Sequence, residues 1–278
     1  MKTFPEKLQE AQSACNSLLC VGLDPDPHKI PQHLLARYDV PQAIYHFNAA
    51  IIEATQAFTA AFKPNLAFFE ALGVQGWAVF KKTLDTIPAD KLVIADAKRG
   101  DIGNTARKYA EAFLVQFDCD AITVSPYMGA DSVLPFLGFP GKAAFILGLT
   151  SNPGADDFEK QTLIDKDQEH KPLYLAVAQK VKRWQDKMPG TAGLVVGATQ
   201  AVEMRAIRDA TPEMPFLIPG VGVQGGDVQL AVAAGTANGG SVLINASRGI
   251  LYASSKRDFA EAAAKEAQKS AKAIPYGA

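Results

Sequence analysis

The sequence predicts an α/β protein folded as one (β/α)8 barrel, the architecture also called a TIM barrel. Short apolar runs recur eight times along the 278 residues, and the intervals between many of them are long enough to hold a helix. Apolar residues make up 48% of the chain, which is enough for a substantial core. The alternative fold is an open doubly wound sheet, but no GxGxxG dinucleotide turn follows the first run.

Each apolar run is short and ends at polar or turn-forming residues, as expected for buried parallel strands. The expected strands are residues 18–23, 60–64, 92–95, 121–124, 143–149, 193–196, 215–219 and 241–244. Amphipathic helical patterns occupy several intervals, namely 42–58, 105–117, 173–187 and 202–210. Neither a linker nor a shift in composition divides the chain. We therefore expect a single domain over residues 1–278, with a short helical extension at its N-terminus.

The longest irregular candidate is residues 151–171, which follow the fifth expected strand and are rich in Asp, Glu and Lys. Loops of this length in compact domains are often functional. We expect this segment to be either a lid over the site or an irregular loop.

The overall composition excludes several classes of function. Lys and Arg number 28 against 29 Asp and Glu, so no basic surface favours nucleic acid. The cysteines Cys15, Cys20 and Cys119 form no CxxC pair and indicate reduced thiols. The N-terminus lacks the apolar core of a secretory signal, and no run reaches the length of a transmembrane helix. We expect a cytoplasmic protein that binds neither nucleic acid nor membrane.

The polar residues that follow the apolar runs are the candidate functional residues, because active sites of this fold lie at the C-terminal ends of the strands. Those residues are Asp24, Lys63, Asn65, Asp96, Lys98, Ser125, Ser151, the glycines near position 220, and Arg248.

The most informative stretch is residues 92–102, where an apolar run stops at Asp96 and Lys98 and is followed by Asp101. In extended geometry Asp96 and Lys98 point to the same side of the strand. Such charges are costly to remove from water unless they pair with each other or bind a ligand. A salt bridge with a helix cap at Asp101 is the purely structural alternative. The position at a barrel strand's end favours a catalytic centre whose lysine is held charged by acids on both sides.

Lys63 and Asp24 extend this charge set to the first two strands. A lysine on a buried strand usually needs a carboxylate partner, and Asp96 on the adjacent third strand is placed to supply one. Asp24 ends the first strand before Pro25. A turn-forming role suits Asp26 better than Asp24.

A glycine-rich turn over residues 219–227 and Arg248 follow the seventh and eighth expected strands. Glycines let backbone N–H groups approach an anion closely, and an arginine holds phosphate oxygens in bidentate fashion. The loops after these two strands are the usual phosphate site of the fold. We therefore expect a phosphorylated ligand.

The histidines indicate no metal site. His28, His33, His46 and His170 fall outside the strand ends, and neither HExxH nor clustered Cys/His spacing occurs.

Five motifs stand at the ends of the expected strands. They are DAKRGDIGNT at 96–105, FKPNLAFFE at 62–70, VGLDP at 21–25, PGVG at 219–222 and SRG at 247–249. Together they resemble the orotidine 5′-phosphate decarboxylase family, and the long form of the Lys63 motif resembles its bacterial second subgroup. The motif at 96–105 is highly specific, whereas the glycine loop at 219–222 is not.

This resemblance implies decarboxylation of orotidine 5′-monophosphate to UMP, the last step of de novo pyrimidine synthesis, with no metal or organic cofactor. Lys98 would stabilise and protonate a carbanion at pyrimidine C6, and Asp96 would lie beside the substrate carboxylate. Lys63 and Asp24 would hold ribose hydroxyls and complete the charge network.

The resemblance also implies a homodimer with shared active sites, in which Asp101, Ile102 and Thr105 reach the partner's site. Ser151 would contact the pyrimidine, and Gln224 would close over the phosphate. The expected substrate-binding residues are Asp24, Asn65, Ile102, Thr105, Ser151, Pro219, Gly220, Gly222, Gln224, Arg248 and Gly249, beside the catalytic Lys98, Asp96, Asp101 and Lys63.

Two other functions fit parts of this pattern. A metal-dependent sugar-phosphate decarboxylase or aldolase shares the Asp-x-Lys-x-x-Asp core but carries an acid on the second strand to help bind Mg2+, where this chain has Lys63. A non-catalytic nucleotide-binding regulator is the other alternative, although no residue of the catalytic set is missing.

Overall fold

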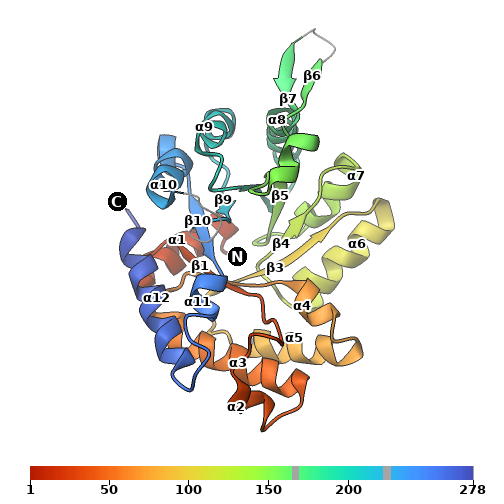
Figure 1. Ribbon diagram of the computed structural model, residues 1–278. Helices are drawn as coiled ribbons and strands as arrows, with labels where there is room; N and C mark the ends of the chain where they lie inside the picture. Colours follow the sequence, from red (N-terminus) through yellow and green to blue (C-terminus); the bar gives the residue numbers. More distant parts are fainter. Residues whose placement is uncertain (165–168, 222–226, 278) are drawn as a thin grey trace. The chain divides into compact units, whose positions relative to one another are not determined.

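The sheet of the computed structural model is a closed barrel of eight strands, which confirms the predicted fold class (Figure 1). The structure describes residues 1–164, 169–221 and 227–277. The strand order around the barrel is β1-β10-β9-β8-β5-β4-β3-β2. The barrel strands are β1 (Leu19–Leu23), β2 (Ala61–Pro64), β3 (Leu92–Arg99), β4 (Ala121–Val124), β5 (Ala143–Leu149), β8 (Thr191–Val196), β9 (Phe216–Ile218) and β10 (Val242–Ala246).

Helices alternate with these strands along the chain. The α-helices are α1 (Phe4–Cys15), α2 (Gln32–Leu35), α3 (Val40–Thr55), α4 (Leu66–Glu70), α5 (Val74–Thr86), α6 (Gly103–Glu111), α7 (Ala130–Val133), α8 (Leu173–Gln185), α9 (Ala201–Ala210), α10 (Val228–Thr236), α11 (Arg248–Leu251) and α12 (Phe259–Ala273). Short helical segments of other types are η1 (Gln56–Phe58), η2 (Ala112–Gln116), η3 (Leu134–Gly138), η4 (Pro153–Asp157) and η5 (Ala237–Gly239). None of the helices in the described part of the chain is long and apolar enough to cross a membrane.

The strands are apolar runs because both of their faces are covered. Every residue of β1, β2 and β4 is buried, and these strands pair in parallel with their neighbours. In the register between β1 and β2, Gly22 lies opposite Lys63 and Leu23 opposite Pro64. The carboxyl ends of β1 and β2 therefore lie level with each other.

Local sequence signals determine where helix α3 begins. The side chain of Asp39 accepts a hydrogen bond from the amide of Gln42 at 2.9 Å, and Pro41 stands in the first turn. Further along, Ile44, Phe47 and Ile51 recur at spacings of three and four and are fully buried. The helix therefore lays one apolar stripe against the core.

The chain divides into two compact units. The first comprises residues 1–6 and 98–244, and the second comprises residues 7–97 and 245–278. Strand β3 contributes Asp96 to the second unit and Lys98 to the first.

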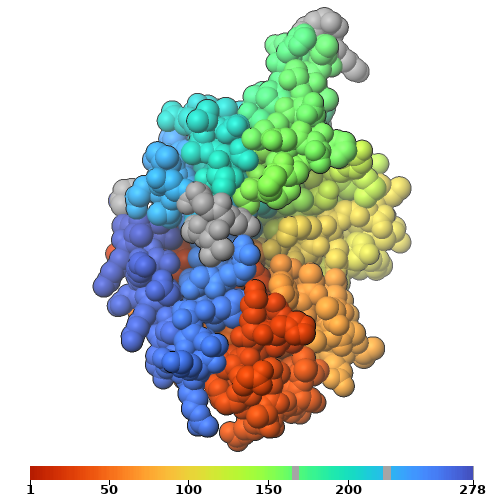
Figure 2. Space-filling model, viewed as in Figure 1, coloured from red at the N-terminus to blue at the C-terminus, as the bar shows by residue number. Residues whose placement is uncertain are grey.

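In the first unit, the described part of residues 151–172 contains η4 and a small antiparallel pair of strands, β6 (Thr162–Ile164) and β7 (His170–Pro172). Between these strands Thr162 pairs with Pro172, and Ile164 pairs with His170. Figure 1 shows β6 and β7 extending past helix α8 of the same unit, and in Figure 2 the atoms of this region project from the surface. That the segment acts as a lid stays a prediction.

A buried arginine ties the end of α9 to neighbouring loops of the first unit. Arg208 is fully buried, and its guanidinium lies 3.5 Å from the centre of the Phe216 ring. Burial lowers the pKa of Arg208 to about 10, so the side chain keeps its charge at neutral pH. Its N–H groups donate to the backbone carbonyls of Gly235, Thr211, Pro212, Met214 and Ser241. These carbonyls replace the carboxylate partner that a buried cation usually has.

Candidate active site

A buried ion pair joins the ends of β2 and β3 in the second unit. The Nζ atom of Lys63 lies 2.5 Å from Oδ2 of Asp96, and the two residues are only 4% and 8% exposed. Backbone pairing of β2 with β3 continues to Asn65, which bridges to Asp96. The two charges therefore come from the backbone of adjacent strands, which leaves them little freedom to separate.

The electrostatic environment keeps Lys63 protonated. Burial alone opposes the ammonium and lowers the pKa of Lys63. The carboxylates of Asp96 and Asp24 outweigh this effect, so the pKa lies above its ordinary value. The neighbouring thiol of Cys20 is fully buried, and burial raises its pKa to about 12. At neutral pH the interior of this unit thus holds a fixed ammonium between carboxylates and a neutral thiol.

Three side-chain acceptors of the same unit are buried without a hydrogen-bond partner among the described residues. One is Oδ1 of Asn48 on helix α3, and the other two are Oδ1 of Asp24, just after β1, and Oδ1 of Asn245, on β10. Asn245 is 7% exposed, and its amide nitrogen lies 3.3 Å from the hydroxyl oxygen of Ser247. A buried acceptor without a donor is costly. The two oxygens at the strand ends are therefore suited to a ligand that brings hydroxyl donors.

Close backbone packing places β1 beside the segment that follows β10. A Cβ atom on Gly22 would overlap the hydroxyl of Ser247 and would lie 3.2 Å from Oδ1 of Asn245. Only glycine fits at this position of β1 without moving its neighbours.

Tyr252 fixes the loop that follows β1. Its hydroxyl donates to the carbonyl of Asp24 at 2.6 Å and accepts from the amide of Asp26 at 2.7 Å. Burial raises the pKa of Tyr252 to about 12, so the phenol keeps the proton that it donates. Its ring stacks on Phe47 at 6.0 Å between ring centres. Sequence reasoning did not single out Tyr252 or Asn245, because the contacts of Tyr252 span more than 220 positions.

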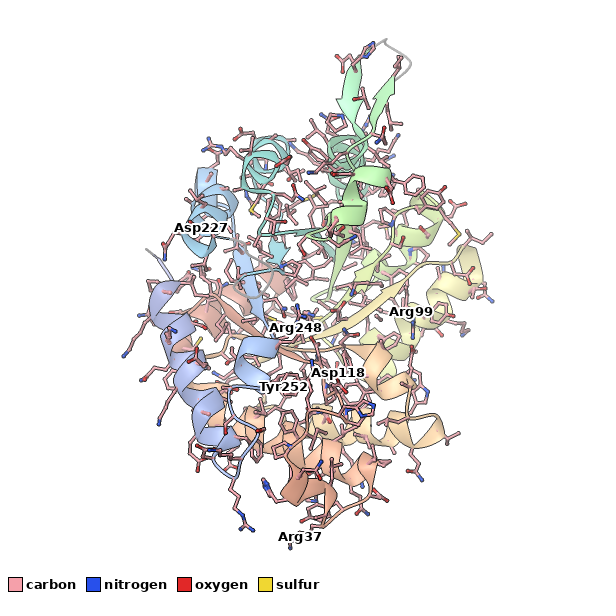
Figure 3. The ribbon with its side chains drawn as sticks, in the orientation of Figure 1. Arg37, Arg99, Asp118, Asp227, Arg248 and Tyr252 are labelled. Atoms are coloured by element: carbon pink, nitrogen blue, oxygen red, sulfur yellow. The ribbon has the colours of Figure 1, made fainter. Side chains whose placement is uncertain are left out.

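The predicted phosphate residues of the second unit stand at the start of α11. Arg248 is the first residue of this helix, Gly249 is the second, and both are exposed. Figure 3 labels Arg248, the first residue of α11, and Tyr252, the residue that directly follows this helix.

In the first unit, the backbone of Lys98 departs from the extended geometry that the sequence suggested. Its φ angle is +47°, in the left-handed region, although β3 includes this residue. The amide of Lys98 donates to the hydroxyl of Thr123 on β4 at 2.9 Å. Simple strand alternation therefore does not set the direction of the Lys98 side chain.

The loop after β3 carries the three residues expected to reach a partner subunit. Asp101 is partly exposed, and its Oδ1 accepts from the amide of Ile102 at 2.7 Å. Ile102 is 56% exposed, and Thr105 is exposed in the first turn of α6. An apolar side chain exposed to this degree suits a surface that another protein covers.

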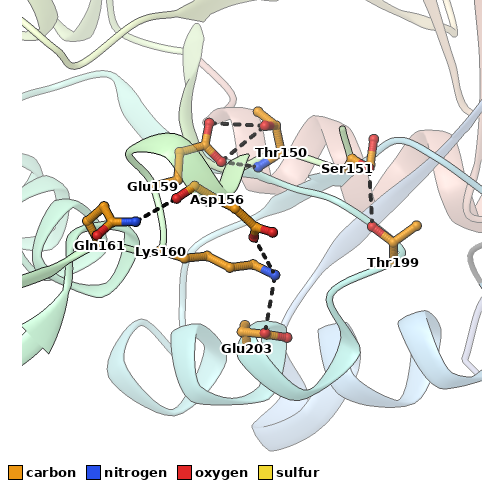
Figure 4. Close-up of polar contacts among 8 residues, drawn as sticks. All are labelled: Thr150, Ser151, Asp156, Glu159, Lys160, Gln161, Thr199 and Glu203. Atoms are coloured by element: carbon orange, nitrogen blue, oxygen red, sulfur yellow. Dashed lines mark hydrogen bonds and ion pairs between the residues drawn. The ribbon is translucent and has the colours of Figure 1, made fainter. Parts of the chain in front are cut away.

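Ser151 begins a loop that polar contacts hold in place (Figure 4). The carboxylate of Glu159 accepts from the amide of Thr150 at 2.7 Å and from its hydroxyl at 3.0 Å. The carbonyl of Ser151 lies 3.5 Å from the hydroxyl oxygen of Thr199, and a Cβ on Gly197 would lie 2.7 Å from the Ser151 amide. The backbone at Ser151 is thus fixed by its own segment and by the residues after β8.

The glycine-rich turn after β9 is described only in part. The carbonyl of Pro219 accepts from the amide of Ala198 at 2.8 Å, and Gly220 has a φ angle of +95° that favours glycine. Gly222 and Gln224, both predicted to bind the substrate, lie outside the described residues.

Comparisons with known proteins agree with one another. The family model of the orotidine 5′-phosphate decarboxylase / HUMPS family matches residues 17–263. The chain is 48% identical over 274 residues to the orotidine 5′-phosphate decarboxylase of Dehalococcoides mccartyi, covering 98% of this chain and 97% of that protein. It is 48% identical over 266 residues to the protein of the same name from Herpetosiphon aurantiacus, covering 95% of each chain.

Solved structures from Leishmania donovani are similar as well. OMP decarboxylase of this organism superposes with a TM-score of 0.80 at 37% identity, covering 98% of this chain and all of that one. UMP synthase of the same organism has a TM-score of 0.82 at 38% identity, covering 97% of this chain and 57% of that longer protein.

The replacement Asp96→Asn tests the buried pair. It leaves the Lys63 ammonium buried beside a neutral amide, so we expect a loss of about 3 to 5 kcal/mol in the free energy of unfolding. The folded pKa of Lys63 is raised, so this stabilisation is fully present at neutral pH. It declines only as the pH rises through and above the ordinary lysine range. Urea denaturation at several pH values measures both effects.

The matched control is Asp85→Asn, which removes a carboxylate from an exposed pair with Lys81. We expect it to leave the urea midpoint nearly unchanged. An equally small effect of Asp96→Asn would show that the buried pair contributes nothing to the stability of the fold.

Proposed function

This chain belongs to the orotidine 5′-phosphate decarboxylase family, and we propose that it converts orotidine 5′-monophosphate into UMP and CO2. The observation that carries the proposal is the buried Lys63–Asp96 pair at the ends of β2 and β3, in a chain that has every charged residue of the family's motif. The reaction needs positive charge fixed where an anion develops, and a pair enclosed in the protein supplies charge that does not reorganise.

We assign the chemical step to Lys98. The bond between pyrimidine C6 and the carboxylate carbon breaks, its electron pair stays on C6, and CO2 leaves. The ammonium of Lys98 stabilises this carbanion and then donates its proton to C6. Solvent later returns a proton to the lysine. Asp96 lies beside the leaving carboxylate and holds the charge of Lys63 in place.

Binding of the ribose is assigned to the second unit. Lys63 and Asp24 hold ribose hydroxyls, and Asn65 belongs to the same group of residues. The unpaired Oδ1 of Asp24 supports this assignment, because a hydroxyl donor from the sugar would satisfy it. Inorganic phosphate is an anion at neutral pH, so the Asp24 carboxylate would repel it. The buried end of β1 therefore suits a sugar better than an inorganic anion.

Arg248 and Gly249 bind the phosphate together with Pro219, Gly220, Gly222 and Gln224. Ser151 contacts the pyrimidine. Phosphate binding far from C6 supplies energy that serves to close and desolvate the site. Arg248 is exposed, and its planar guanidinium is suited to hold phosphate oxygens in bidentate fashion.

We propose that the reaction needs no metal ion. The ammonium of Lys63 lies 2.5 Å from Oδ2 of Asp96 and already supplies the positive charge that a divalent cation would bring to this carboxylate. A second cation at this position would repel Lys63.

The three cysteines form no disulfide, and the enzyme is assigned to the reducing cytoplasm.

We also propose a homodimer in which Asp101, Ile102 and Thr105 serve the partner's site. The loops after β3 and β4 lie together in the first unit, since the Ser125 amide donates to the Arg99 carbonyl at 2.8 Å. They expose apolar side chains: Ile102 is 56% exposed, Met128 is 50% exposed and Tyr127 is 87% exposed. Burial of this surface by a second copy would account for its composition.

Lys98→Ala tests the proposed function. Purified wild-type protein should remove the absorbance of the orotate ring when it is mixed with orotidine 5′-monophosphate, and the rate should be the same in EDTA. Lys98→Ala should lower kcat by at least about 1,000-fold, because it removes both the general acid and the fixed positive charge. The exposed Lys81→Ala is the control and should keep wild-type activity.

Near-normal turnover by a folded Lys98→Ala variant would contradict the mechanism. Loss of activity in EDTA would favour the metal-dependent alternative. Tight binding of UMP by a wild-type protein that releases no CO2 would indicate a nucleotide-binding regulator instead.

Ile102→Glu tests the homodimer. Placing a charge on the apolar surface should convert a dimer into a monomer in light scattering coupled to gel filtration, and decarboxylation should fall with it. Val202→Glu on α9 is the control, because Val202 is 83% exposed and lies outside the proposed interface. A wild-type protein that is monomeric and fully active at assay concentration would overturn the shared site.

A further inference from the structure

We propose that Thr123 is a positioning residue for decarboxylation, which acts by holding the backbone of Lys98 in its left-handed conformation. The inference rests on the proposed function, because it takes Lys98 as the residue that protonates C6. Nothing in the resemblance to the family pointed to Thr123. The contact that suggests it lies wholly within the first unit.

The backbone of Lys98 is unusual for its residue type. Within the described part of the chain, the non-glycine residues with positive φ are Asn16, Lys98, Asp118 and Asn238. Asn and Asp reach this region readily, because their short side chains form hydrogen bonds with the local backbone. Lysine has no such compensation. A lysine kept in this conformation needs surroundings that hold it there, and such positions are concentrated at functional sites.

Thr123 supplies one of the contacts that hold it. The amide of Lys98 donates to the Thr123 hydroxyl on β4 at 2.9 Å. In a regular pair of strands this amide would donate to a backbone carbonyl of the neighbouring strand. Thr123 is 1% exposed, and its branched side chain has restricted rotation within a strand. Just beyond, a backbone hydrogen bond joins the two segments again, because the Ser125 amide donates to the Arg99 carbonyl at 2.8 Å.

The conformation of this one residue sets the direction of its side chain. In an extended strand Lys98 would project on the same side as Asp96. A φ of +47° is not extended geometry, so at Lys98 the alternation of the strand no longer sets the direction of the bond from Cα to Cβ. Without an acceptor for its amide, the residue would relax toward the extended form and carry the ammonium with it. A displacement of about 1 Å at a catalytic group is enough to slow a reaction about 100-fold.

The alternative is that Thr123 only satisfies a buried amide and fills space. The two readings differ in their kinetic effects. A packing residue would change stability, and with it the amount of active protein. A positioning residue changes kcat while the ribose and phosphate contacts still bind the nucleotide.

Thr123→Val and Thr123→Ser separate these readings. Valine keeps the shape but removes the acceptor, whereas serine keeps the hydroxyl. We expect Thr123→Val to lower kcat by about 10- to 100-fold. KM for orotidine 5′-monophosphate and the dissociation constant of UMP should change by less than about threefold, which is under 1 kcal/mol. Thr123→Ser should restore most of kcat.

Hydrogen exchange gives a readout that does not depend on turnover. The Lys98 amide should exchange slowly in the wild-type protein and in Thr123→Ser, and quickly in Thr123→Val. The control for loss of a buried threonine hydroxyl is Thr83→Val on α5, where Thr83 is fully buried beside Asn48. It should affect stability without lowering kcat.

Wild-type kcat in Thr123→Val would overturn the inference. So would an equal loss of kcat and UMP affinity that serine does not restore. Failure of the proposed function would look different, because the wild-type protein would then show no decarboxylation, or Lys98→Ala would remain active.

Discussion

The contact between the Lys63 ammonium and the Asp96 carboxylate is the interaction on which the rest of the structure depends. Each ion loses several kcal/mol of hydration when it is buried, and their attraction offsets this cost only when the geometry is good. Adjacent parallel strands provide such geometry, because their backbone hydrogen bonds fix the distance between the two side chains. The barrel thus holds charge that solvent would otherwise screen, and this fixed charge is the basis of the proposed catalysis.

Other local features cost stability. In the second unit, acceptors at Asp24 and Asn245 are buried without a donor. In the first unit, Lys98 adopts a backbone conformation that lysine rarely takes. Proteins usually keep such features where a ligand or a reaction requires them. The proposed function would account for both, because a hydroxylated ligand would satisfy the acceptors and catalysis would require one ammonium to be held in a set direction.

The sequence predicted the barrel because parallel strands covered on both faces appear as short apolar runs with polar ends. It also predicted that Lys63 needs a carboxylate and that Asp96 is placed to supply one, since both follow from burial and strand order. It did not predict the role of Tyr252, whose contacts join positions more than 220 residues apart. Nor did it predict the left-handed backbone at Lys98, whose amide donates to the Thr123 hydroxyl of the next strand. Pattern reasoning follows one strand at a time, and these features arise from pairing between distant segments.

Exchange of the C6 proton of 5-fluoro-UMP with D2O tests the central claim most directly. An enzyme whose Lys98 protonates a C6 carbanion must also remove that proton in the reverse direction, and the fluorine makes the C–H bond more acidic. The account predicts that the wild-type protein incorporates deuterium at C6, as followed by proton NMR, and that Lys98→Ala does not. Exchange by a folded Lys98→Ala variant at the wild-type rate would contradict it, because another group would then be carrying the proton.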